Sequence, residues 1–277
     1  MLSALFKYSF LQNAFLGAII ASILCGIIGT IIVEKKMVMM SGGIAHTAFG
    51  GIGLGYFLGI EPIIGALFFS TAAALGAAAI KKKSDTNTDI IMGIFWSMGM
   101  AAGILFIAFT PGYPPDMASY LFGDILTIRR VDLWIMAALC LVTVLTVALF
   151  FNSFKAYLFD EEFAYIMKIK TQVLEYITYA MIAFTVVVLI RVVGIILLIS
   201  LLTAPPAIAR MFSYNLKKIM LLSMVLGILF CIFGLWVSYE LEIASGAAIV
   251  LIAGFTYIAA SLLRRLNIAK TFNRKTV

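Results

Sequence analysis

The run Ser41-Gly-Gly-Ile-Ala-His-Thr-Ala-Phe-Gly-Gly-Ile-Gly-Leu-Gly-Tyr56 is glycine-rich, almost wholly apolar, and holds the only histidine of the chain, His46. An apolar run without charged residues is typical of a helix inside a lipid bilayer. An ionisable side chain is costly at that depth unless it faces other helices or a water-filled path. His46 is therefore a candidate ligand for a transported substrate. The alternative is a neutral histidine that donates a hydrogen bond to a carbonyl group of a neighbouring helix.

The composition of the whole chain also indicates a membrane protein. Of its 277 residues, 64% are hydrophobic and only 12% are charged, and the mean hydropathy is +1.12. Apolar segments follow one another without a polar stretch as long as a soluble domain. We therefore predict an all-α polytopic membrane protein, with a single transmembrane domain over residues 1–265 and a basic cytoplasmic tail over residues 266–277.

The apolar segments predict the number of membrane spans, because each span needs about 20 such residues. We expect eight to nine spans, with nine favoured, near residues 13–33, 42–60, 62–80, 90–110, 131–151, 173–190, 192–209, 216–238 and 245–263. The run 173–209 is too long for one crossing. We predict that the chain reverses within it, at a break between Arg191 and Gly194.

The positions of the basic residues support nine crossings, because short cytoplasmic loops are enriched in lysine and arginine. With the amino terminus outside and the carboxyl terminus in the cytoplasm, every lysine and arginine lies inside except Lys7, Arg129, Arg130 and Arg191. This bias explains the net charge of +7. The sequence therefore predicts contact with membrane lipid and no nucleic-acid partner.

Two further features bear on packing and on chemistry. Gly51 and Gly55, and likewise Gly99 and Gly103, are small residues four apart, a spacing that lets two helices approach closely. The chain has no glycine-rich loop ending in Lys-Ser or Lys-Thr, so we expect no nucleotide hydrolysis by the chain itself. It also has no paired histidines or facing carboxylates within a span, which argues against an intramembrane enzyme.

Several stretches together resemble one known family. The segment Gly42-Gly-Ile-Ala-His-Thr-Ala-Phe-Gly-Gly51 is similar to the second-helix motif D-A-I-S-H-A-x-L-P-G of the manganese/zinc-type ABC transporter permeases. Other stretches resemble this family in the same order along the chain, namely Asp89–Ile94, Ser119–Leu126, Phe159–Ala164, Leu201–Arg210 and Ser245–Val250. Each match is weak alone, but the ordered set is specific.

The resemblance implies a multi-pass permease subunit in a prokaryotic cell membrane. Its expected partners are a second copy of the chain, a cytosolic ATP-binding subunit, and an extracellular or periplasmic metal-binding protein. The substrate would be a divalent metal ion, and no permanently bound cofactor is expected. The alternative is a permease for a chelated metal or a corrinoid, which belongs to a related class of importers.

The resemblance places His46 on the metal pathway, but the chain departs from the motif at Gly42. The family has an acid there, one helical turn before the histidine and on the same face. Glycine offers no side-chain ligand, so oxygen would come from Ser41, from the backbone of Gly42, from Thr47, from water or from the second copy. Loss of the carboxylate favours zinc over manganese, because manganese prefers oxygen ligands whereas zinc binds imidazole well.

The stretch from Thr203 to Met211 is the predicted point of contact with the ATPase. Two prolines should stop or kink the helix there and leave a short helix at the cytoplasmic face that ends in a cation. The coupling residues that we predict are Thr203, Pro205, Pro206, Ala207 and Arg210. A second, charge-rich segment, Phe159–Lys170, could lie on the membrane surface or dock a cytosolic partner.

Overall fold

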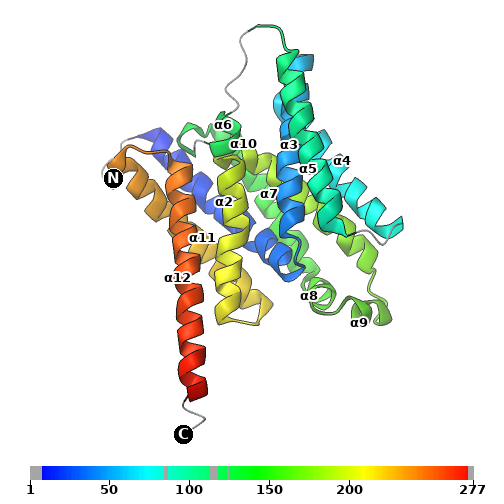
Figure 1. Ribbon diagram of the computed structural model, residues 1–277, viewed down its shortest axis with the longest axis vertical. Helices are drawn as coiled ribbons and strands as arrows, with labels where there is room; N and C mark the ends of the chain where they lie inside the picture. Colours follow the sequence, from blue (N-terminus) through cyan, green and yellow to red (C-terminus); the bar gives the residue numbers. More distant parts are fainter. Residues whose placement is uncertain (1–7, 84–86, 113–117, 124, 274–277) are drawn as a thin grey trace.

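The computed structural model describes residues 8–83, 87–112, 118–123 and 125–273, and this described part is built of helices without strands (Figure 1). In chain order the elements are α2 (Ser9–Glu34), α3 (Val38–Leu58), α4 (Pro62–Lys83), α5 (Thr88–Ala108), α6 (Ala118–Phe122), the 3-10 turn η1 (Ile125–Thr127), α7 (Arg130–Leu149), α8 (Phe151–Phe159), α9 (Glu161–Ile166), α10 (Thr171–Phe212), α11 (Leu216–Leu241) and α12 (Ser245–Asn273). The prediction of an all-α polytopic fold is confirmed.

Helices α3, α4 and α5 form one tightly packed unit because their glycines let the backbones meet. A side chain at Gly51 would collide with the carbonyl group of Gly65 on α4. A Cβ atom at Gly99 of α5 would lie 2.5 Å from the Cα atom of Thr47, and one at Gly103 would lie 2.6 Å from the ring of Phe49. The predicted packing role of these glycines is confirmed, and it follows from the close helix approach that small residues permit in membranes.

The long helix α10 is interrupted at Gly194, whose backbone angles are φ 74° and ψ 166°. This region of the backbone map is open to glycine and strained for other residues. The two halves of α10 meet there beside α6, where Gly194 contacts the backbone of Phe122 and Gly123 (Figure 1). The break predicted between Arg191 and Gly194 therefore falls at its last residue.

Three ion pairs show that the chain reverses at this break. From the start to the end of α10 they are Glu175–Lys81 at 2.8 Å, Arg191–Glu61 at 2.9 Å and Arg210–Glu34 at 3.2 Å. Lys81 and Glu61 lie at opposite ends of α4, so the first half of α10 runs antiparallel to α4. Glu34 is the last residue of α2, shortly before the start of α3. Because α3 and α4 are antiparallel, the start of α3 lies on the same side of the molecule as Lys81 near the end of α4. Both ends of α10 thus lie on one side of the molecule, and Arg191 lies on the other.

Within the described residues, seven helices are long and apolar enough to cross a membrane. This set counts α10 once and leaves out α3, whose glycines and histidine lower its hydropathy. The nine spans that we predict require α3 as a crossing and α10 as two, and this number remains a prediction, as does the orientation of the termini. Helix α12 continues to Asn273, so the predicted tail begins as helix, and residues 274–277 lie outside the described part.

Candidate functional site

His46 lies in the middle of α3, on the side that faces α5. Its imidazole stacks on the indole of Trp96, with the ring centroids 4.0 Å apart and the planes 9° from parallel. The side chain is half-buried, and its Nδ1 atom is buried without a hydrogen-bond partner. An unpaired buried nitrogen is costly. The hydrogen bond to a neighbouring carbonyl group that the packing alternative required is therefore not made through Nδ1.

Gly42 lies one turn before His46 and faces the same indole. A Cβ atom at Gly42 would be 3.5 Å from Cζ3 of Trp96 and 3.9 Å from Cδ1 of Ile199 on α10, which are ordinary van der Waals distances. The site thus lies where α3, α5 and the second half of α10 meet. A longer side chain at position 42 would extend beside the indole.

The two hydroxyl groups that we predicted as weaker metal ligands make hydrogen bonds within the protein. Ser41 Oγ donates to the carbonyl oxygen of Val38 at 2.8 Å. Thr47 Oγ1 lies 2.7 Å from the carbonyl oxygen of Gly43 and 3.1 Å from that of Phe95, so it links α3 to α5. Both side chains are buried. Their hydroxyl groups donate within the protein, and their role as metal ligands stays a prediction.

No group of three or more histidine, cysteine, aspartate or glutamate side chains that could hold a metal ion occurs among the described residues. His46 is the only histidine of the chain, so a metal site on α3 would have a single imidazole from this chain. Such a position suits a brief stop on a pathway better than tight storage, because a transported ion must also leave.

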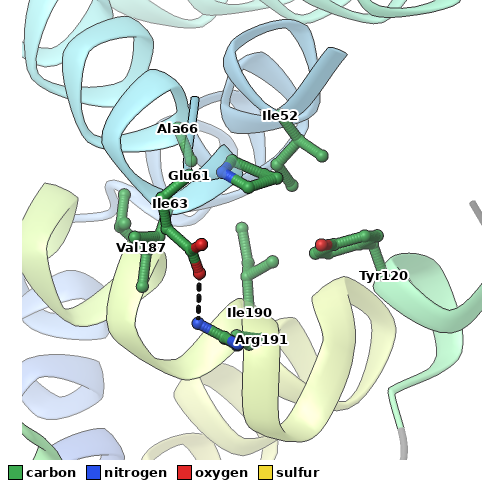
Figure 2. A pocket seen from close by; sticks show the side chains of 9 residues that line it. Ile52, Glu61, Ile63, Ala66, Tyr120, Val187, Ile190 and Arg191 are labelled. Carbon is green, nitrogen blue, oxygen red and sulfur yellow. Dashed lines mark hydrogen bonds and ion pairs between the residues drawn. The ribbon is translucent and has the colours of Figure 1, made fainter. Parts of the chain in front are cut away.

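A second cluster, made of charged residues, lies where the beginning of α4 meets the reversal in α10 (Figure 2). Arg191 donates to Glu61 at 2.9 Å, and its Nε lies 3.9 Å from a carboxylate oxygen of Asp132, the first-turn acid of α7. Asp132 also accepts from the Nε of Arg129 at 3.1 Å and from its backbone N–H at 3.2 Å. We call Glu61, Arg129, Asp132 and Arg191 the Arg191 cluster. It joins the beginnings of α4 and α7 to the reversal in α10.

A cavity of about 20 Å³ adjoins this cluster, lined by Ile52, Glu61, Pro62, Ile63, Ala66, Tyr120, Val187, Ile190 and Arg191 (Figure 2). That volume holds about one water molecule. The Tyr120 hydroxyl lies 3.1 Å from that of Tyr56, and burial together with this hydrogen bond raises the pKa of Tyr120 above its usual value. Ile52 is six residues beyond His46, about 9 Å along α3. This small cavity itself has no room for a hydrated ion.

Comparison with known proteins identifies the fold. Residues 7–264 match the ABC 3 transport family. The chain belongs to this family. The sequence resemblance to manganese/zinc-type permeases is thereby confirmed, and the chain is a multi-pass membrane permease subunit of a prokaryotic ABC transporter and not an enzyme.

Three similar proteins cover nearly the whole permease. A membrane protein of Synechocystis, slr2045, is 40% identical over 94% of this chain and 92% of its own length. The manganese transport system membrane protein MntC of Listeria monocytogenes is 33% identical over 94% of this chain and 93% of its own. The solved structure of PsaBC from Streptococcus pneumoniae in complex with Fab has a TM-score of 0.84 and 30% identity, over 94% of this chain and 93% of that one.

One prediction about the coupling segment of the permease was wrong. Pro205 and Pro206 do not stop α10, which continues as helix to Phe212 and has its one non-helical residue at Gly194. Membrane helices tolerate proline where neighbouring helices and hydroxyl side chains support the backbone. Here the prolines are buried, and Gly29 of α2 packs against Pro206 and against the carbonyl group of Leu202, which Pro206 leaves without its helical partner. The Thr203 hydroxyl donates to the carbonyl oxygen of Ile199 at 2.8 Å. The predicted short surface helix is instead the end of a buried one.

Of the other predicted coupling residues, Ala207 is half-buried and Arg210 is exposed. Arg210 forms the ion pair with Glu34, whose side chain is 8% exposed. The segment thus presents one cation to the surface and ties the end of α10 to the end of α2.

The charge-rich segment Phe159–Lys170 contains the whole of α9, on the side of the molecule that carries both ends of α10. Exposed apolar side chains gather there, with Phe163 54%, Tyr165 75% and Ile166 74% exposed. Lys35, which follows α2, pairs with Glu161 of α9 at 2.8 Å. This surface is therefore anchored to α2 next to the site of Arg210.

No local pattern pointed to Trp96, which lies 50 positions beyond His46 on another helix. No such pattern indicated the pairing of Arg191 with Glu61 and Asp132 either. Charge bias placed Arg129 and Arg191 on the same, outer side of the membrane, but only helix packing determines which carboxylate each arginine meets.

Proposed function

We propose that this permease imports a divalent metal ion and that His46 is a ligand on the ion's path. The observation that carries the proposal is the half-buried imidazole with an unpaired Nδ1 atom, at the meeting point of α3, α5 and α10. Imidazole is among the commonest metal ligands in proteins. A relative whose name states manganese transport supports metal as the substrate class.

The nature of the ligand favours zinc, with manganese second. His46 provides nitrogen and the neighbouring position 42 provides no carboxylate, whereas manganese prefers oxygen ligands. The name of the Listeria relative argues for manganese. The import of a chelated metal or corrinoid is the less favoured alternative, because relatives that match nearly the whole chain are named for the transport of manganese.

The proposed complex contains two copies of this chain, two cytosolic ATPases and a metal-binding protein outside the cell. We infer that the ATPase docks on α9 and on the exposed end of α10 at Arg210. Exposed apolar residues on short helices at a water-facing end support a protein contact. The ion pairs Lys35–Glu161 and Arg210–Glu34 would pass a movement of the ATPase to α2 and α10.

In the proposed cycle, ATP binding closes the two motors and opens the path toward the outside, and the metal-binding protein releases its ion toward His46. Hydrolysis then opens the cytoplasmic side. The Arg191 cluster lies at the predicted outer end. Its ion pairs hold α4 against α10, so opening on that side requires them to separate.

The test is ATP-dependent uptake of radioactive zinc and manganese into proteoliposomes with the full complex. Wild type is compared with His46→Ala and with His46→Gln, which keeps hydrogen-bonding atoms but is a poor metal ligand. Loss of uptake in both variants, with ATPase activity retained, supports the ligand role. Normal uptake by His46→Gln would show that His46 serves helix packing and is not a metal ligand. No uptake of either ion by wild type would favour the chelate permease.

A further inference from the structure

The environment of His46 is dominated by one side chain, the indole of Trp96. The two rings are nearly parallel at a centroid distance of 4.0 Å. One face of the imidazole is thus covered, and the ring is held by a large planar partner. A metal ligand of this kind depends on neighbours that fix its orientation.

The position of the indole is fixed by close contacts between α5 and α3. A Cβ atom at Gly43 would lie 2.7 Å from the side chain of Met92, one turn before Trp96. The carbonyl oxygen of Phe95 accepts from Thr47 at 3.1 Å, and Gly99 packs against the backbone of the same threonine. These contacts flank Trp96 on α5, so the helix cannot rotate the indole away without breaking them.

The indole also borders the space in front of Gly42. A Cβ atom there would already lie 3.5 Å from Cζ3 of the ring. A carboxylate at position 42 would extend further and meet the indole or Ile199. Gly42 and Trp96 therefore border the same space beside His46.

We propose that Trp96 determines the metal specificity of the site at His46. Its indole holds the imidazole in place and keeps carboxylate oxygen away from it. This inference rests on the proposed metal transport. A site that offers nitrogen without a protein carboxylate binds zinc in preference to manganese. Trp96 thus acts on the ion through His46, as a positioning residue, and sets the ratio of zinc to manganese uptake.

The decisive experiment is a double-mutant cycle in the reconstituted complex, with uptake of zinc and of manganese measured for each variant. Gly42→Asp alone lowers uptake of both ions about tenfold, because its carboxylate meets the indole. Trp96→Ala alone lowers zinc uptake about tenfold, because the imidazole loses its support. The double variant regains uptake and prefers manganese, because the carboxylate now fits beside His46.

Two further variants separate this role from packing. Trp96→Phe keeps an aromatic face and retains the zinc preference of wild type. Trp134→Ala removes a tryptophan that is 77% exposed on α7 and leaves the ratio of the two ions unchanged. A double variant no better than the poorer single variant, or an unchanged ratio of zinc to manganese in Trp96→Ala, would overturn the proposal.

A binding measurement makes the inference testable apart from transport. In a Trp134→Phe, Trp236→Phe background, Trp96 is the sole tryptophan of the chain. Zinc added to the purified protein changes its fluorescence, and His46→Ala abolishes the change. Absence of any zinc effect in a complex that transports zinc overturns the role of Trp96 and leaves the proposed function standing. A His46-dependent change in a complex that transports neither ion supports the Trp96–His46 site and refutes the proposed function.

Discussion

The surroundings of His46 and the Arg191 cluster are held together by different forces. Around His46, α3 meets α4 and α5 through glycines, and two hydroxyl groups bond within the protein. Around Arg191, the beginnings of α4 and α7 meet α10 through ion pairs in which Arg191 and Glu61 remain partly exposed and Asp132 is buried. Inside a membrane there is no water to drive apolar association, so close packing of small residues replaces it.

This difference has a functional consequence. Glycine contacts tolerate little movement, since backbone atoms already touch. Ion pairs at a water-facing end can separate and re-form, because water solvates the released charges. The contrast assigns a rigid role to the α3–α4–α5 unit and a movable one to its contact with α10 near Arg191.

The largest expected effect comes from a substitution in the glycine contacts between α3 and α4. Gly51→Ala places a methyl group against the carbonyl of Gly65, and we expect a loss of about 3 kcal/mol in the free energy of unfolding. Gly93→Ala is the matched control, because a Cβ atom at Gly93 meets no other atom within 4 Å. Thermal unfolding in detergent compares the two. Equal midpoints would show that α3 and α4 pack less closely than the structure has them.

The next effect concerns the ion pair at the other end of α10. Arg210→Glu sets two carboxylates side by side, because Glu34 is largely buried, and we expect a loss of about 2 kcal/mol once the exposure of Arg210 is allowed for. The charge swap Arg210→Glu with Glu34→Arg restores stability. If Arg210 also contacts the ATPase, the swap is stable yet uncouples ATP hydrolysis from uptake. A swapped variant with normal coupled uptake contradicts the coupling role.

A smaller effect is expected at the Arg191 cluster. A double-mutant cycle of Arg191→Gln and Glu61→Gln should give a coupling energy of about 0.5–1 kcal/mol, because the pair is partly exposed. The coupling falls as salt is added, since salt screens exposed charges. Arg130→Gln serves as the control, because Arg130 is an exposed neighbour that takes part in no ion pair within the described residues. A coupling that is independent of salt would mean a buried pair.

The smallest effect sharpens the distinction between packing and transport. Thr47→Val removes the hydroxyl that links α3 to α5, at an expected cost of about 0.6 kcal/mol, and leaves the ratio of zinc to manganese uptake unchanged. Thr47→Ser keeps the hydroxyl and is the control. A ratio of zinc to manganese uptake that changes in Thr47→Val but not in Thr47→Ser would show that this hydroxyl is a metal ligand.

Much of the fold could be read from local features of the sequence. Hydropathy gave the membrane class, and the order of weak motifs gave the family. The spacing of Gly51, Gly55, Gly99 and Gly103 gave close helix contacts. The break at Gly194 could be predicted because one apolar run was too long for a single crossing and held an arginine. Each of these inferences concerns residues that are near one another in the chain.

The same local reasoning failed at the prolines. Proline breaks most helices in water. At Pro205 and Pro206 the surroundings support the helix, and this support comes from α2, more than 170 positions earlier in the sequence. The propensity of a residue is a weak guide where tertiary packing supplies the missing contacts. A surface helix was therefore predicted where the structure has the buried end of α10.

The sequence by itself determined that the chain is a helical membrane permease with one histidine in a glycine-rich helix and no acid one turn before it. Only the tertiary structure decided that Trp96 covers that histidine, that Gly42 faces the indole, and that Arg191 meets Glu61 and Asp132. Hydropathy and spacing record how each helix sits in the membrane. The angle and register at which two helices meet depend on the packing of every side chain between them, and no local pattern carries that information.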